Sequence, residues 1–197
     1  MKKRIILGAA GLVLGLASLC FAATSIRIAA TIGETHQMNV ALSRVASQGA
    51  TPTLVADLTG TGMDFGTLTE NPTDHNFRST VFFFIDAPVV SNKTGWTITH
   101  TATDFANSAG NNLNANTNVT FMKAVPGGET ALTGNSYVSY SAAKTRAAIA
   151  QAELTGGWLR IYYGIAQGSL DAPGVNVITT AMPTGSYVGT VTLTLSP

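Results

Sequence analysis

Apolar and polar residues alternate with a period of two along much of this chain, and this pattern limits its fold more than any other feature. Clean alternation occupies residues 26–32, 95–101, 158–166 and 185–195. Because the side chains of a strand point to opposite faces in turn, each run predicts a half-buried β-strand. Residues 80–87 (TVFFFIDA) are almost continuously apolar, which is typical of a central strand covered on both faces.

About nine short strands with turn signals between them suit a sandwich or jelly roll. Residues 119–125 and the segment after Glu129 flank the turn Pro126–Gly128 and predict a hairpin. Strand and helix patterns do not alternate regularly, which argues against a parallel α/β fold. The predicted fold is therefore all-β, an Ig-like (immunoglobulin-like) or jelly-roll β-sandwich.

Two segments interrupt the strand pattern. Residues 142–154 (AAKTRAAIAQAEL) are rich in alanine and end before two glycines, so they predict the one short helix of the chain. Residues 104–118 (DFANSAGNNLNANTN) are rich in asparagine, which favours turns. They predict a solvated loop.

The N-terminus predicts export. Basic residues at positions 2–4 precede the uncharged apolar stretch 5–21, and small residues follow it. This order is typical of a signal peptide, here residues 1–22 with cleavage after Ala22 or the next alanine. The stretch is short and rich in Gly and Ala for a membrane span, although an uncleaved anchor is the alternative. We expect the mature chain, residues 23–197, to have no membrane span and to be secreted, extracellular or at the cell surface.

Cys20 is the one cysteine of the chain, and it lies inside the predicted signal peptide. Leu19 precedes it where a lipobox has a small residue, so lipidation is not expected. Cleavage after Ala22 removes this cysteine. The mature chain then has no disulfide, no thiol nucleophile and no thiolate metal site.

The charge of the chain limits its partners. Without the three basic residues of the signal peptide, 8 of the 11 basic residues remain against 10 acidic ones. This balance excludes strong attraction to nucleic acid or to an anionic membrane. Charged residues are only 11% of the chain, below the usual quarter. Such a neutral surface, rich in Thr, Asn and Ser, is common both in extracellular proteins that pack against their own copies and in carbohydrate-binding domains.

Residues that could carry catalysis are scattered. The histidines His36, His75 and His100 have no metal-ligand spacing, and no G-x-S-x-G elbow occurs. His100 shares a strand face with apolar residues and is read as a histidine on a strand face or rim. Four carboxylates that could serve a glycoside hydrolase are spread over a strand and a loop: Asp64, Glu70, Asp74 and Asp86. We therefore expect no enzyme and no cofactor.

The sequence offers two weaker candidates for a binding site. Asp104 is the single carboxylate of the 104–118 loop, and it makes that loop a weak calcium candidate because the EF-hand order of ligands is absent. The aromatics Trp96, Trp158, Tyr162 and Tyr163 either form a platform that stacks on sugars or belong to the core of the sandwich. The core is the preferred reading.

The mature chain begins with a strand pattern, residues 23–34, almost at the cleavage site. A free alternating strand adds to the open sheet edge of a neighbouring subunit through main-chain hydrogen bonds, unless it pairs within its own domain. Repeated head to tail, such exchange gives an open filament. The apolar residues of the donor are Ile26, Ile28, Ala30 and Ile32. The candidate acceptor groove comprises Phe82, Phe84, Tyr187, Val191 and Leu193.

Two segments carry a family resemblance: 64–68 (DFGTL) and 183–195 (PTGSYVGTVTLTL). They resemble segments of secreted bacterial β-sandwich fibre subunits, the spore coat protein U-type and chaperone–usher-like pilin domains. The resemblance covers about a fifth of the chain and implies polymerisation through an N-terminal strand. It also implies an assembly chaperone or an outer-membrane usher as partner. The mature chain lacks the disulfide usual in pilins, which leaves the assembly route open.

These observations lead to one preferred function and one alternative. The preferred function is a structural subunit of an extracellular pilus-like filament or surface matrix, a homopolymer assembled by β-strand addition. The alternative is a secreted carbohydrate-binding module that uses the aromatic residues.

Overall fold

The computed structural model of the chain describes residues 33–45, 54–58, 62–134 and 136–197, and only the backbone of 54–58. Contacts divide the chain into Met1–Gly33 and Glu34–Pro197, and the fold below belongs to the second unit. The predicted signal peptide and the predicted donor residues Ile26, Ile28, Ala30 and Ile32 lie outside the described residues. What the sequence suggests for them stays a prediction.

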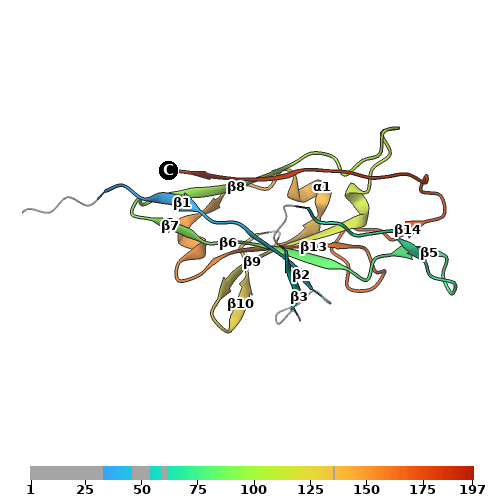
Figure 1. Ribbon diagram of the computed structural model, residues 1–197, viewed down its shortest axis with the longest axis horizontal. Helices are drawn as coiled ribbons and strands as arrows, with labels where there is room; N and C mark the ends of the chain where they lie inside the picture. Colours follow the sequence, from blue (N-terminus) through green and yellow to red (C-terminus); the bar gives the residue numbers. More distant parts are fainter. Residues whose placement is uncertain (1–32, 46–53, 59–61, 135) are drawn as a thin grey trace, which may run out of the picture. The chain divides into compact units, whose positions relative to one another are not determined.

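The largest sheet is antiparallel and forms one layer of the fold (Figure 1). Strand β11 (Tyr137–Ser139) also pairs with β9 of this sheet. In spatial order the sheet contains β10 (Gly128–Ala131), β9 (Thr117–Val125), β13 (Trp158–Ile165), β6 (Phe82–Ala87), β2 (Ala41–Val45) and β3 (Leu54–Leu58).

A three-stranded antiparallel sheet forms the second layer. Its order is β12 (Ile149–Ala150), β8 (Thr97–Ala102) and β15 (Val191–Ser196). In Figure 1, β15 is the red C-terminal strand that runs beside β8, above β6, β9 and β13. Two smaller sheets join β1 (His36–Met38) to β7 (Val89–Ser91), and β14 (Ile178–Thr179) to β5 (Asn76–Arg78) and β4 (Thr69–Glu70).

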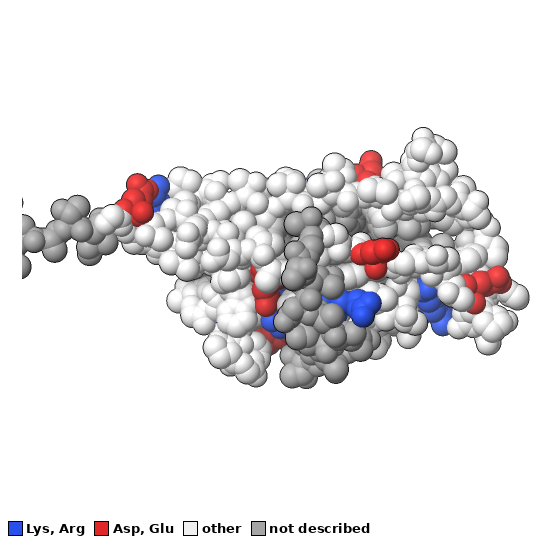
Figure 2. Space-filling model, viewed as in Figure 1, with Lys and Arg blue, Asp and Glu red and all other residues white. Residues whose placement is uncertain are grey.

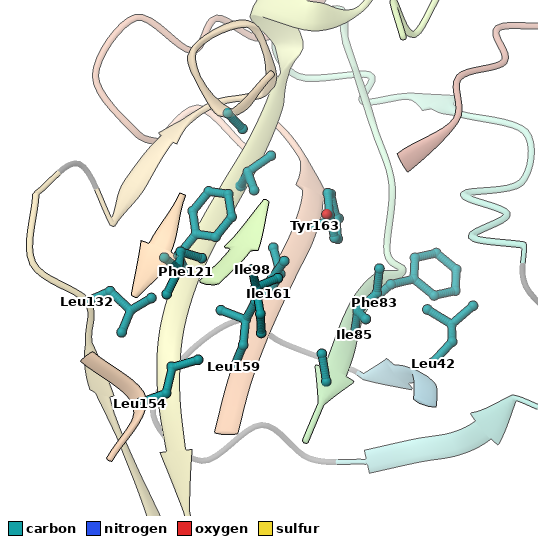
Figure 3. Close-up of a cluster of buried hydrophobic side chains, with 14 of the residues drawn as sticks. Leu42, Phe83, Ile85, Ile98, Phe121, Leu132, Leu154, Leu159, Ile161 and Tyr163 are labelled. Carbon is teal, nitrogen blue, oxygen red and sulfur yellow. The ribbon is translucent and has the colours of Figure 1, made fainter. Parts of the chain in front are cut away.

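The main core lies between these two layers. Phe83 of β6, Phe121 of β9 and Ile161 of β13 meet Ile98 of β8 in one buried cluster (Figure 3). Each of these residues alternates with neighbours on the other face of its strand, as the period-two pattern requires. The prediction of an all-β sandwich is confirmed.

The predicted central strand is also confirmed. β6 pairs with β13 on one side and with β2 on the other. Phe83 and Ile85 point into the main core, whereas Phe84 packs on the opposite face against Tyr162 and Val45. The hairpin predicted around Pro126 forms between β9 and β10.

The helix predicted over 142–154 is much shorter in the structure. The α-helix α1 covers Tyr140–Ala143, and the 3₁₀ helix η2 covers Gln151–Leu154. Between them, the guanidinium of Arg146 lies over the ring of Phe121 at 4.6 Å, and Ile149 pairs with Ile98. Tertiary contacts therefore override the alanine-rich helix propensity of this segment.

The loop predicted over 104–118 is not simply solvated. Asn114, Asn116 and Asn118 are 6%, 8% and 2% exposed. The amide of Asn114 accepts from Phe105 N at 2.9 Å, and that of Asn116 donates to Asn176 O at 2.8 Å. These asparagines fill the interior because their amides satisfy main-chain groups that would otherwise be buried without partners. The segment includes the 3₁₀ helix η1 (Asn114–Asn116).

Candidate functional site

Strand β15 forms an edge of the smaller layer. It pairs with β8 over residues 191–196, and no strand in the described part of the chain pairs with its other side. Thr103 N donates to Thr190 O at 2.9 Å, so the main chain of Thr190 faces β8. Because ladder bonds alternate along an antiparallel strand, the main-chain groups of Val191, Leu193 and Leu195 face the open side.

The side chains of β15 alternate between the core and the solvent. Val191, Leu193 and Leu195 pack against the main core but remain only partly buried. Thr192 and Thr194, on the opposite face, are exposed. A strand edge with partly exposed core residues is a template for pairing with another strand.

Charged residues, which commonly protect sheet edges from such pairing, are absent from β15 (VTLTLS) and from β8 (TITHTA). Figure 2 shows the same face of the molecule as Figure 1, and the strip of surface along β15 carries no Lys, Arg, Asp or Glu in this view. The edge is therefore both open and uncharged.

An apolar cavity of about 530 Å³ lies where the chain approaches β15. The segment 64–68 lines one part of it and the segment 183–187, which leads into β15, lines another. Phe77, Phe105 and Ile178 supply apolar walls. The two segments that carry the family resemblance thus meet across one cavity, although they are far apart in the sequence.

Local hydrogen bonds fix both lining segments. The carboxylate of Asp64 accepts from Gly66 N at 2.8 Å, and Gly66 has a φ of 68°, a left-handed value that favours glycine. The hydroxyl of Tyr187 donates to Pro183 O at 2.6 Å. The walls of the cavity are therefore held in place by short-range contacts.

The five residues predicted as an acceptor groove do not come together. Phe82 and Phe84 lie with Tyr162 on the face of the large sheet that points away from the main core. Val191 and Leu193 pack on the main core, and Tyr187 packs in a third cluster with Leu113, Ile165 and Ile178. The predicted groove residues therefore lie in three separate places: the outer face of the large sheet, the edge strand β15 and the cavity at Tyr187. The last two places follow each other directly along the chain.

The weak calcium candidate Asp104 is engaged by other side chains. Its carboxylate pairs with the ammonium of Lys144 and accepts from Asn114 Nδ2 at 2.6 Å. The hydrogen bond from Lys144 lowers the pKa of this carboxyl. No group of three or more His, Cys, Asp or Glu residues that could hold a metal ion occurs in the described ranges.

The aromatic residues considered for sugar stacking are mostly internal. Trp96, Tyr162 and Tyr163 are 8%, 1% and 1% exposed, and only Trp158 is intermediate. Three buried rings cannot present a flat stacking surface. His100 is buried as well, on the face of β8 that also carries Ile98. It lies between the ring of Phe121 and the hydroxyl of Tyr163, so it is a strand-face histidine and not a rim histidine.

A search of protein-family models, curated proteins and solved structures finds no match to the chain. In the described part, no helix is both long enough and apolar enough to span a membrane. The resemblance to spore coat protein U-type and pilin domains therefore stays a prediction.

Proposed function

We propose that this protein is a secreted structural subunit that assembles into an extracellular filament or surface matrix by β-strand addition. The observation that carries the proposal is the open, uncharged edge of β15. An edge that accepts a strand needs unpaired main-chain groups and apolar side chains that the new strand can cover. Along its open side β15 offers both, and the apolar side chains are those of Val191, Leu193 and Leu195. The strand is supplied by the mature N-terminus of another copy.

The pattern of the predicted donor fits this edge. Ile26, Ile28, Ala30 and Ile32 repeat every second residue, which is the period of the inward side chains of β15. An extended strand advances about 3.3 Å per residue, so 26–32 spans about 20 Å and 191–195 about 13 Å. A donor laid along β15 therefore extends beyond it by about one apolar residue.

The cavity offers a place for that additional side chain. Beyond Val191 the chain leads back to the segment 183–187, which lines the apolar cavity of about 530 Å³. A donor that extends past Val191 buries more apolar surface, at about 25 cal/mol per Å², so this direction is favoured.

The test compares the mature chain, residues 23–197, with a chain that starts at residue 33. We expect filaments in negative-stain electron microscopy from the longer chain and monomers from the shorter one. A Leu193→Lys variant of the longer chain should also stay monomeric, because a charge that points inward at an edge strand opposes pairing. Circular dichroism verifies that each variant is folded.

Thr101→Lys is the matched control. Thr101 is exposed on the outer face of β8, the central strand of its sheet, so a lysine there adds the same charge without touching the open edge. This variant should form filaments. Filaments from the chain that starts at residue 33, or none from the intact mature chain, would refute assembly by N-terminal strand addition.

A further inference from the structure

A second cavity, of about 550 Å³, lies on the face of the large sheet that points away from the main core. Phe82, Met122 and Tyr162 form its floor, and they alternate along their strands with residues of the main core. Tyr137 and the loop 167–171 contribute to its rim. Its volume lies within the range of about 300–1,000 Å³ that is usual for small-molecule sites.

Glu129 of β10 is one of the residues that line this cavity, and its carboxylate is incompletely bonded. Its side chain is 1% exposed. One oxygen, Oε2, accepts from the hydroxyl of Tyr162 at 2.8 Å and lies 3.5 Å from Nη1 of Arg160. The other oxygen, Oε1, is buried and has no hydrogen-bond partner in the described part of the chain. Sequence reasoning does not single out Glu129, because nothing near it in the sequence marks it as buried.

Arg160 does not fully neutralise this carboxylate. Its guanidinium is held by Asp86 through two hydrogen bonds of 2.7 Å and lies over the ring of Phe84 at 4.2 Å. Burial raises the pKa of Glu129 in spite of its contacts with Tyr162 and Arg160. The carboxyl group therefore retains capacity to accept a hydrogen bond, in an environment where such a bond is strong.

The rim of the cavity is preorganised. Leu170 has a φ of 65°, an uncommon value for a residue other than glycine, and the residue is 91% exposed. The hydroxyl of Tyr137 donates to Leu170 O. The carboxylate of Asp171 accepts from Gly168 N at 2.7 Å and from Asn118 Nδ2 at 2.8 Å. A strained conformation that is held by several hydrogen bonds is characteristic of functional loops.

The lining of the cavity limits the chemistry of a ligand. Among the described residues, neither Lys nor Arg lines it, whereas Glu129 and Asp171 do, so an anionic ligand is disfavoured. Asp171 is already saturated by the loop and by Asn118. The remaining surface combines hydroxyls and amides with apolar and aromatic side chains. This combination suits a neutral ring that bears hydroxyl groups and has an apolar face.

We propose that this cavity binds a neutral sugar unit whose apolar face lies on Phe82 and Met122. One hydroxyl of the sugar donates to Oε1 of Glu129, and because this oxygen is closed to solvent, the carboxyl group turns toward the cavity when the sugar binds. This inference does not depend on filament assembly. It also differs from the aromatic platform considered from the sequence, with which it shares only Tyr162.

The test titrates the isotopically labelled mature protein with single sugars and follows its amide resonances by nuclear magnetic resonance. The probes are the neutral sugars glucose, galactose, mannose and N-acetylglucosamine, the cationic sugar glucosamine and the anionic sugar glucuronic acid. We expect at least one neutral sugar to give saturable shifts in the strands and loop that line the cavity. Glu129→Gln should weaken its binding about tenfold or more, because the hydrogen bond to a charged acceptor is lost.

Two further variants keep the test decisive if Glu129→Gln does not fold. Ala131→Trp fills the cavity from the exposed end of β10 and should abolish binding with the Glu129 carboxylate intact. Glu70→Gln changes an exposed carboxylate elsewhere and should leave the affinity unchanged. The proposal is overturned if no neutral sugar binds, if only glucosamine or only glucuronic acid binds, or if binding survives in the folded cavity variants.

Discussion

His100 Nε2 and the hydroxyl of Tyr163 lie 2.9 Å apart between the two layers of the sandwich. The other ring nitrogen, Nδ1, lies 3.0 Å from Ala143 O. Because a carbonyl oxygen only accepts, Nδ1 carries the proton and Nε2 accepts from Tyr163. The imidazole is thus neutral and fully bonded inside the core, which makes its role structural.

Stability should depend on pH through His100. Burial lowers the pKa of His100 below its ordinary value of 6.5, so the unfolded chain takes up this proton at a higher pH than the folded chain does. The contribution of neutral His100 to the free energy of unfolding is therefore complete above the pKa that this histidine has in the unfolded chain. It decreases as the pH falls below that pKa. Urea unfolding at pH values of about 7.5 and about 5.5 measures the decrease. His100→Gln should reduce this dependence, and a loss of the dependence in His75→Asn instead would contradict the assignment.

Tyr163→Phe should destabilise the fold by about 1–3 kcal/mol, because it leaves the acceptor nitrogen of a buried imidazole without a donor. The free energy of unfolding in urea gives the value. Tyr187→Phe removes a hydroxyl that bonds Pro183 O at an exposed position, so it should lower the free energy of unfolding by clearly less. If both variants lost the same free energy of unfolding, burial of the unpaired imidazole nitrogen would have no measurable cost.

Arg160→Lys should lower the free energy of unfolding by about 1.5 kcal/mol or more, although it preserves the charge. Arg160 donates two hydrogen bonds to Asp86, and an ammonium cannot reproduce this planar, two-pronged geometry. The lysine side chain would also lose much of the contact that the guanidinium of Arg160 makes with the Phe84 ring. Chemical denaturation measures the loss. Lys144→Arg, at an exposed pair with Asp104, is the matched control and should have little effect.

Gly157→Ala should destabilise the protein by about 3 kcal/mol. A Cβ at Gly157 would lie 2.2 Å from the carbonyl oxygen of Ala124, whereas one at Gly128 has its nearest neighbour, a Val125 methyl, at 3.9 Å. Gly128→Ala is therefore the control, and its melting temperature should change little. A Gly157→Ala protein as stable as the wild type would mean that the β13 start moves readily away from β9.

Mixing two assembly-defective chains should restore a defined complex. The chain that starts at residue 33 keeps the β15 edge but lacks the donor, and the Leu193→Lys chain keeps the donor but has a blocked edge. Strand addition predicts that each is monomeric alone and that the mixture forms a dimer with one copy of each. Size-exclusion chromatography with light scattering tests this expectation. Long polymers in the mixture, or no dimer, would be incompatible with one donor and one acceptor per subunit.

Much of the fold could be predicted from local pattern. The alternation over 158–165 and the continuous apolar run at 82–87 predict β13 and β6, because the period of side chains in a strand is a property of the backbone itself. The turn residues Pro126 and Gly127 predict the β9–β10 hairpin through their own backbone preferences. The alanine-rich segment 142–154 fails because contacts from distant strands outweigh weak helix propensity.

The sites depend on contacts that no local pattern encodes. The sequence by itself determined the all-β class, the low charge and the inward side chains Val191 and Leu193 of the last strand. Only the tertiary structure decided that β15 has an open side, that segments 64–68 and 183–187 meet across a cavity, and that the Glu129 carboxylate is buried beside Tyr162. The physical reason is that strand order and burial arise from long-range pairing, and residues far apart in the chain make these contacts only in the folded state.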